Sequence, residues 1–305
     1  MKKVLGSVLS LAVLTAVSSS VFASTYALPP LSESLIGERQ TINAAAGDNV
    51  VTLASKYDIG FNAIQNANPD LDMTRGFPLN TPVVIATDHL LPNVPRIGIV
   101  VNLPEMRMYY YLEGSNEVLT YPIGIGKIGK TIPIIQTAIT YKRENPTWTP
   151  PADIREFNLK QGIVLPKVMP AGPDNPLGKY AIYMKIPTYL MHSTIFPESI
   201  GTRASFGCLR MYESDIESFF PTITSGIPVE IINMPNKTGW QSHFFYLEVH
   251  PPLEEHAQEF DATLPGLVHT IVEETKNQPT LIDWQAVSFI AKDKDGLPHS
   301  VGMAV

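Results

Sequence analysis

The 27 prolines of this 305-residue chain restrict its fold more than any other feature of the sequence. A proline inside a helix removes one backbone hydrogen bond and clashes with the preceding turn, so the chain is expected to be loop-rich and mostly β. Short runs rich in β-branched and aromatic residues lie at 97–102, 106–111, 117–123, 137–143, 180–186 and 229–232. Short strands divided by glycine and proline turns predict an antiparallel sandwich or barrel, with a hairpin turn around Pro104 and Glu105.

Residues 1–23 have the three parts of a secretory signal peptide. Lys2 and Lys3 precede an apolar run over residues 4–17, and the segment ends with a small residue, Ala23, as a cleavage site does. The apolar run is too short for a typical membrane span, so we expect cleavage after Ala23 and export. A retained N-terminal anchor is the alternative.

Charge and composition limit the classes of partner. Without residues 1–23 the chain has 20 basic and 29 acidic residues, a formal net charge of −9. This balance argues against nucleic acid and against an anionic membrane surface as partners. The hydrophobic content of 44% is enough to bury one large core and a smaller one.

The single cysteine, Cys208, lies in a segment whose residue types suit nucleophilic catalysis. A thiol attacks only as the thiolate, so a catalytic cysteine needs a base nearby, and His192 lies sixteen positions upstream. Pro197 and Gly201 allow the intervening segment to loop back. Gly207 lets the backbone turn before the thiol and lets peptide N–H groups approach an oxyanion. A lone cysteine is more often a small buried core residue, so these residues alone leave that interpretation open.

The complete segment reads His192-Ser193-Thr194, then Ile200-Gly201-Thr202-Arg203-Ala204-Ser205, then Gly207-Cys208-Leu209-Arg210-Met211. It resembles the signature of the L,D-transpeptidases with a YkuD-like catalytic domain, H-[GS]-T, I-G-x-R-x-S and G-C-[IVL]-R-[ML]. One position departs from the pattern, because many members have a histidine before the glycine and this chain has Phe206. The resemblance keeps the upstream histidine as the base and excludes a second imidazole.

The resemblance implies roles for seven residues. Cys208 is expected to be the nucleophile, His192 the proton donor and acceptor, and Gly207 a source of backbone N–H groups for the oxyanion. Ser193 or a backbone carbonyl is expected to orient the histidine. The expected substrate-binding residues are Arg210, Ser205 and Arg203, with a structural ion pair as the alternative role for Arg210. Residues 146–151 and 170–178 resemble family loops that flank the site, and we expect them at the surface.

The implied reaction takes place on peptidoglycan stem peptides in the periplasm. The thiolate attacks the meso-diaminopimelate carbonyl of a tetrapeptide, D-alanine leaves, and an amine takes the acyl group. The amine is a lysine of an outer-membrane lipoprotein or other outer-membrane protein, or a second diaminopimelate. The alternatives are an L,D-carboxypeptidase, in which water replaces the amine, and a non-catalytic peptidoglycan-binding protein. Carbapenems inhibit this family, so Cys208 is an expected carbapenem target.

Neither a cofactor nor a metal is expected. Gly124, Gly126 and Gly129 have the spacing of a dinucleotide-binding loop, but no βαβ pattern or later acidic partner accompanies them. The histidines other than His192, including His243 and His250, lack ligand spacing with cysteines or acids.

Residues 38–87 have the pattern of a small βααβ unit. Asp48 or Asn49 can cap a first helix, and a second helical pattern ends at Asn68 and Pro69. The unit resembles a LysM domain, which implies binding of peptidoglycan glycan. The alternative is an appendage that packs on the enzyme and holds no glycan.

We therefore expect a mainly β catalytic domain of the L,D-transpeptidase sandwich or barrel type at 96–234. The LysM-like domain at 38–87 precedes it through a linker at 89–95, and a small α+β extension follows at 235–305. Residues 212–220 predict an amphipathic helix with Ile216, Phe219 and Phe220 inward and its acids on a solvated face. We assign Asp215 no catalytic role.

Overall fold

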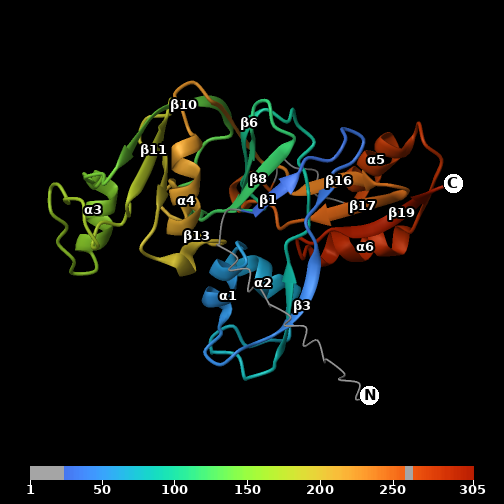
Figure 1. Ribbon diagram of the computed structural model, residues 1–305, viewed down its shortest axis with the longest axis horizontal. Helices are drawn as coiled ribbons and strands as arrows, with labels where there is room; N and C mark the ends of the chain where they lie inside the picture. The colour runs from blue at the N-terminus through green and yellow to red at the C-terminus, as the bar shows by residue number, and fades with distance from the viewer. Residues whose placement is uncertain (1–23, 258–263) are drawn as a thin grey trace, which may run out of the picture.

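The computed structural model describes residues 24–257 and 264–305, and its fold is mainly β (Figure 1). A nine-stranded sheet forms the centre of the protein, a βααβ unit packs beside it, and a four-stranded sheet with two helices follows at the C-terminal end. The predicted signal peptide lies outside the described residues. Within the described ranges, no helix is long and apolar enough to cross a membrane.

The nine-stranded sheet confirms the strands predicted from the β-branched and aromatic runs. In spatial order its strands are β1 (Ser24–Ala27), β8 (Glu117–Pro122), β7 (Arg107–Tyr111), β6 (Gly98–Asn102), β15 (Pro228–Ile232), β10 (Ile135–Glu144), β11 (Tyr180–Met184), β12 (Leu190–Ser193) and β14 (Leu209–Met211). The predicted hairpin is the antiparallel pair β6 and β7. The prediction of a purely antiparallel sheet is wrong, because β15 pairs with β6 and β12 with β14 in parallel. Two further strands, β9 (Ile125–Gly126) and β13 (Arg203–Ser205), pair separately.

Helix α4 (Glu213–Phe219) covers the main core of this sheet. Ile216 and Phe219 are fully buried, and the Phe219 ring packs against Tyr110 and Tyr121 at centroid distances of 5.5 and 5.0 Å. Phe220 is only partly buried. The prediction of a solvated acidic face is wrong for Asp215, which is 2% exposed. The preceding βααβ unit covers this position of the helix.

That unit has the predicted order of elements, β3 (Arg39–Asn43), α1 (Val50–Lys56), α2 (Phe61–Ala67) and β4 (Pro82–Ala86), with its own apolar core. Asn49 caps α1 as predicted, because its Oδ1 accepts hydrogen bonds from the Val51 and Thr52 N–H groups at 2.9 and 3.1 Å. The Thr52 hydroxyl accepts from the Asn49 N–H in return, which completes a capping box.

The unit packs directly on the segment between the two motif ends. The Phe61 N–H donates to the Ile200 carbonyl at 2.9 Å, and the Tyr212 hydroxyl donates to the Ile59 carbonyl at 3.1 Å. A Cβ on Gly60 would lie 2.8 Å from the Gly201 Cα, so the two backbones touch. The βααβ unit therefore supports the backbone that joins His192 to Cys208.

The expected linker is not an exposed connection. Its first residues form β5 (His89–Leu90), which pairs with β2 (Leu35–Ile36), and residues 89–91 are buried. The C-terminal part of the chain covers these residues: the Leu90 carbonyl accepts a hydrogen bond from the Lys237 ammonium, and the Leu90 N–H donates to the Glu248 carboxylate.

The C-terminal part is a small α+β layer, as expected. Its sheet has the order β16 (Asn236–Gln241), β17 (Phe244–Val249), β19 (His299–Ala304) and β18 (Thr280–Ile282), and its helices are α5 (Leu264–Thr275) and α6 (Trp284–Asp293). Residues 258–263, before α5, lie outside the described ranges. α3 (Ala152–Leu159) and the short turns η1 (Pro197–Ser199), η2 (Phe220–Thr222) and η3 (Glu254–His256) complete the fold.

Candidate active site

The parallel pairing of β12 with β14 brings the two ends of the motif together. The register places His192 opposite Arg210 and Met191 opposite Leu209. Directly paired residues point to the same face of a sheet, and faces alternate along each strand. Met191 and Leu209 accordingly point into the core and are fully buried. His192, Arg210 and the partly exposed Cys208, two positions before Arg210, then belong to the opposite face.

A tight turn presents the thiol at the start of β14. Gly207 has a φ of +115°, and a Cβ there would lie 2.6 Å from the Tyr189 ring, so the position requires glycine. The Ser205 hydroxyl accepts from the Gly207 N–H at 3.0 Å and donates to the Cys208 carbonyl at 2.6 Å. Ser205 therefore shapes the turn. The Gly207 N–H, which we expected to be an oxyanion donor, donates to Ser205 instead. These hydrogen bonds within the turn do not involve the Cys208 N–H.

Backbone geometry also fixes the sulfur. The thiol donates to the Thr188 carbonyl at 3.7 Å, and Thr188 has a φ of +71°, which is strained for a β-branched residue. Strained backbone of this kind is common at functional sites, where the surrounding fold maintains it. Sequence reasoning missed Thr188, because no local pattern signals a positive φ at threonine.

His192 is held in one tautomer. Its Nδ1 lies 2.5 Å from the Ser193 carbonyl, which can only accept, so Nδ1 carries the proton and Nε2 keeps a lone pair. The Ser193 hydroxyl does not contact the ring. It accepts from the Tyr180 N–H at 3.0 Å and donates to the Leu177 carbonyl at 3.1 Å, which anchors β12. Of the two orienting groups expected from the sequence, the backbone carbonyl is the one in contact.

The loop that supplies Leu177 is less exposed than expected. Asn175 is fully buried, and its amide donates to the Pro146 and Pro170 carbonyls at 2.9 and 3.0 Å. These hydrogen bonds of Asn175 connect the loop at residues 146–151 with the loop at residues 170–178.

The two reactive groups are both neutral at rest. Burial, with a smaller effect of the Arg210 charge, lowers the pKa of His192 to about 4. Burial raises the pKa of the Cys208 thiol, and the Leu190 backbone and Arg210 oppose this effect only in part. A neutral imidazole and a protonated thiol therefore belong to the same face of the sheet, and an imidazole in this state can accept a proton from a thiol.

The three expected substrate-binding residues occupy different settings. The Arg203 guanidinium forms a bidentate ion pair with Glu255, at 2.6 and 3.0 Å, and also donates to the Gly126 carbonyl at 3.2 Å. It ties the catalytic domain to the C-terminal part. Arg210 forms no salt bridge with any residue that the structure describes, and its Nε is buried without a hydrogen-bond partner there. Arg210 is thus not held in a salt bridge within the described ranges, although the charge of Glu198 acts on it.

Phe206, the departure from the family pattern, joins the turn before Cys208 to α3. The Lys127 ammonium lies 3.7 Å from the Phe206 ring centroid and 4.0 Å from that of Phe157, and the two rings pack edge to face at 5.2 Å. α3 contains no buried residue, and a Lys130–Asp153 ion pair of 2.7 Å is its other link to this region. Sequence reasoning missed Lys127 and Phe157, since their partners are distant in the chain.

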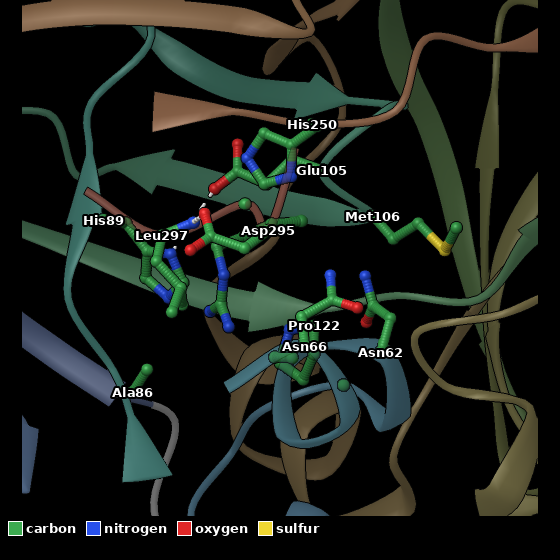
Figure 2. Close-up of a pocket in the computed structure, with 14 residues that line it drawn as sticks. Asn62, Asn66, Ala86, His89, Glu105, Met106, Pro122, His250, Asp295 and Leu297 are labelled. Carbon is green, nitrogen blue, oxygen red and sulfur yellow. Dashed lines mark hydrogen bonds and ion pairs between the residues drawn. The ribbon is translucent and has the colours of Figure 1, made fainter. Parts of the chain in front are cut away.

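A second cluster lies at the junction of the three units, beside a small cavity (Figure 2). His89, Glu105 and Glu248 place potential metal-ligand atoms within 4.8 Å of one another, a grouping that sequence spacing did not reveal. However, the buried Lys237 ammonium lies 2.8 Å from Glu105 and 2.7 Å from Glu248. The cluster therefore already holds a cation, and its ion pairs link the catalytic domain to the C-terminal part.

Comparison with known proteins agrees with this arrangement. Residues 96–231 match the model of the L,D-transpeptidase catalytic domain, YkuD. The chain is 38% identical over 288 residues to the Probable L,D-transpeptidase YcfS of Escherichia coli (strain K12), covering 92% of this chain and 88% of that protein. It is 36% identical over 289 residues to the Probable L,D-transpeptidase YbiS of the same organism, covering 92% of each.

A solved structure, the catalytic domain of the E. faecium L,D-transpeptidase, covers 46% of this chain and 100% of its own, at 19% identity and a TM-score of 0.33. The sequence relatives decide the class of protein, since each of them is named as an L,D-transpeptidase. The chain belongs to the L,D-transpeptidase family.

Proposed function

We propose that the protein is a cysteine L,D-transpeptidase of peptidoglycan. The observation that carries this proposal is the shared face of His192, Cys208 and Arg210 on two parallel strands, with both reactive groups neutral. The membership of the L,D-transpeptidase family supports an acyltransferase that acts on cell-wall stem peptides.

In the proposed mechanism, the Nε2 atom of His192 takes the thiol proton while the Cys208 sulfur attacks the meso-diaminopimelate carbonyl of a tetrapeptide. The Cys208 N–H faces the oxyanion. The intermediate collapses as the bond to D-alanine breaks, and His192 gives its proton to the leaving amine. The acceptor amine then loses a proton to His192, attacks the thioester and releases the thiol.

Arg210 is proposed to bind a carboxylate of the stem peptide. Its guanidinium is partly buried and forms no salt bridge within the described ranges, although the charge of Glu198 acts on it, so a substrate carboxylate would meet a cation that no direct ion pair occupies. Arg203 is a weaker candidate, because a substrate would have to compete with Glu255. Ser205 and Gly207 are proposed to act through the shape of the turn.

The acceptor is proposed to be an amine, either the lysine of an outer-membrane protein or a second diaminopimelate. Export to the periplasm after removal of residues 1–23 follows from the signal-peptide pattern. The βααβ unit is proposed to be a LysM-like domain that binds glycan. Its contacts with Ile200 and Gly201 would place a bound glycan next to the segment that joins the two catalytic residues.

The test is incubation of purified mature protein with a disaccharide tetrapeptide, with and without a lysine-terminated peptide, followed by mass spectrometry. A dimeric muropeptide identifies a cross-linking enzyme, and an adduct formed only with the added peptide identifies an anchoring enzyme. Release of D-alanine without an adduct supports the carboxypeptidase instead. Absence of all products, together with no carbapenem adduct on Cys208, would leave the non-catalytic binding protein. The Cys208→Ala variant is the control.

A further inference from the structure

Two carboxyl groups are buried against each other where the βααβ unit meets α4. Asp58, from the loop between α1 and α2, is 4% exposed, and Asp215, from α4, is 2% exposed. Burial raises the pKa of both carboxyls, and the neighbouring Asp58 raises that of Asp215 further, so the pair favours protonation of at least one of them. Asp58 Oδ1 and Asp215 Oδ2 have no donor among the described residues. Buried carboxyl oxygens without donors are costly, so this pair needs an explanation.

The surrounding elements supply one cation. Arg107 on β7 acts on both carboxyls, while its own guanidinium donates to the Thr120 hydroxyl at 3.0 Å. The other titratable groups that face the pair are the hydroxyls of Tyr121, on β8, and Tyr212, just before α4. Ser214 donates to Asp215 at 3.3 Å. Two carboxyls with one shared cation leave the site short of both positive charge and donors.

A backbone nitrogen already points at the pair. The N–H of Ser24 donates to Asp58 Oδ2 at 2.7 Å. Ser24 is the first residue of β1, and its pairing with Thr120 of β8 fixes its position along the sheet. The sequence places the expected cleavage site immediately before it, after Ala23. The nitrogen that contacts Asp58 is therefore the atom that cleavage would turn into the chain terminus.

We propose that the Asp58 and Asp215 pair is a binding site for the α-ammonium group of Ser24, created when residues 1–23 are removed. Hydrolysis of the Ala23–Ser24 peptide bond consumes one water, leaves a carboxylate on Ala23 and converts the Ser24 N–H into an amine. The amine takes up a proton and becomes an ammonium. The site then gains one positive charge and two N–H donors, which match the carboxyl oxygens that lack donors.

This inference rests on the proposed cleavage after Ala23 and is independent of the proposed chemistry at Cys208. It links processing to the docking of the units, because β1 belongs to the sheet of the catalytic domain and Asp58 to the βααβ unit. The proposed site also requires the chain to start at Ser24 and at no other residue. One extra residue would move the terminus by about 3.3 Å along the strand, beyond hydrogen-bond reach of Asp58.

The first experiment is intact-mass analysis of the exported protein, in which a first residue other than Ser24 would overturn the proposal. The second uses two full-length mature forms released from a cleavable fusion, one starting at Ser24 and one with a glycine added before it. The pH dependence of α-amino acylation, followed by peptide mass spectrometry, gives the pKa of each terminus.

We expect the α-amino pKa of the Ser24 form to exceed the ordinary value of about 7.7–8.0 by at least one pH unit, which slows acylation at pH 8 by about fivefold or more. The glycine-extended form should react at the ordinary rate and melt several degrees lower. In Asp58→Asn the two forms should behave alike. An ordinary pKa for the Ser24 form, or the same difference between forms in Asp58→Asn, refutes the site. If Asp58→Asn does not fold, the acylation comparison of the two wild-type forms decides by itself.

Discussion

The protonation state of the catalytic pair gives a quantitative prediction. The structure indicates a protonated thiol and a neutral imidazole in the candidate pair, since burial lowers the pKa of His192 to about 4 and raises that of Cys208. A histidine with the ordinary pKa of 6.5 would be only about 10% neutral at pH 5.5, whereas one with a pKa of about 4 is about 97% neutral. The available base therefore hardly changes between pH 7.5 and 5.5.

We expect kcat/KM for D-alanine release from the tetrapeptide to fall by less than about twofold over this range, and to decline near pH 4. An ordinary histidine would instead lose about tenfold. The profile alone does not separate a neutral pair from a preformed thiolate and imidazolium, because both give an acidic limb near the lower pKa. The thiolate must be observed directly.

Thiolate absorbance at 240 nm makes this distinction in the resting enzyme, with Cys208→Ser as the baseline. We expect no thiolate signal at pH 7, and ionisation only above the ordinary cysteine value of about 8.5. His192→Gln should leave this titration nearly unchanged while lowering kcat by about 10²-fold or more. A thiolate signal at pH 6–7 that disappears in His192→Gln would refute the neutral pair.

Three further substitutions test the surroundings of the site. Arg210→Met removes a charge that lowers the pKa of His192, so the acidic limb of the kcat/KM pH profile should move to higher pH. KM for the tetrapeptide should also rise. An acidic limb at the wild-type pH would contradict this effect. Lys127→Met should loosen α3, which would be measured as faster proteolysis within residues 152–168 and faster alkylation of Cys208. The control, Lys160→Met, loses only the ion pair with Glu156 within the α3 region and should match wild type. Lys237→Met leaves Glu105 and Glu248 buried without their cation, at a cost of about 3–5 kcal/mol in unfolding free energy by denaturant titration. Its control, Lys276→Met, breaks an exposed pair and should leave Tm unchanged; equal behaviour of the two variants would contradict the role of the buried cluster.

Local features of this fold could be predicted from the sequence. The β-branched and aromatic runs became strands, and the hairpin of β6 and β7 followed from the turn residues between them. Asn49 caps its helix because the cap needs only residues within three positions. These signals are short in range, so one sequence contains them completely.

For the candidate site, the sequence named residues but not their arrangement. The motif indicated Cys208 and His192, but the parallel register that puts them on one face depends on a strand pairing that the motif does not encode. Arg203 could not be separated from Arg210, because the partner that occupies it, Glu255, lies in the C-terminal part. The hydrogen bonds by which Ser205 and Gly207 shape the turn could be found only from the three-dimensional structure.

Asp215 shows why such failures concentrate at contacts between units. Within α4 it lies between Glu213 and Glu217, which are exposed, so helical composition alone predicts a solvated acid. Its burial is caused by Asp58, more than 150 positions earlier, and by a strand that starts at Ser24. A buried acid that no local pattern explains points to a missing cation elsewhere in the chain. We propose as that source the terminus that processing would create, so the error in the sequence prediction and the proposed ammonium site have the same physical origin.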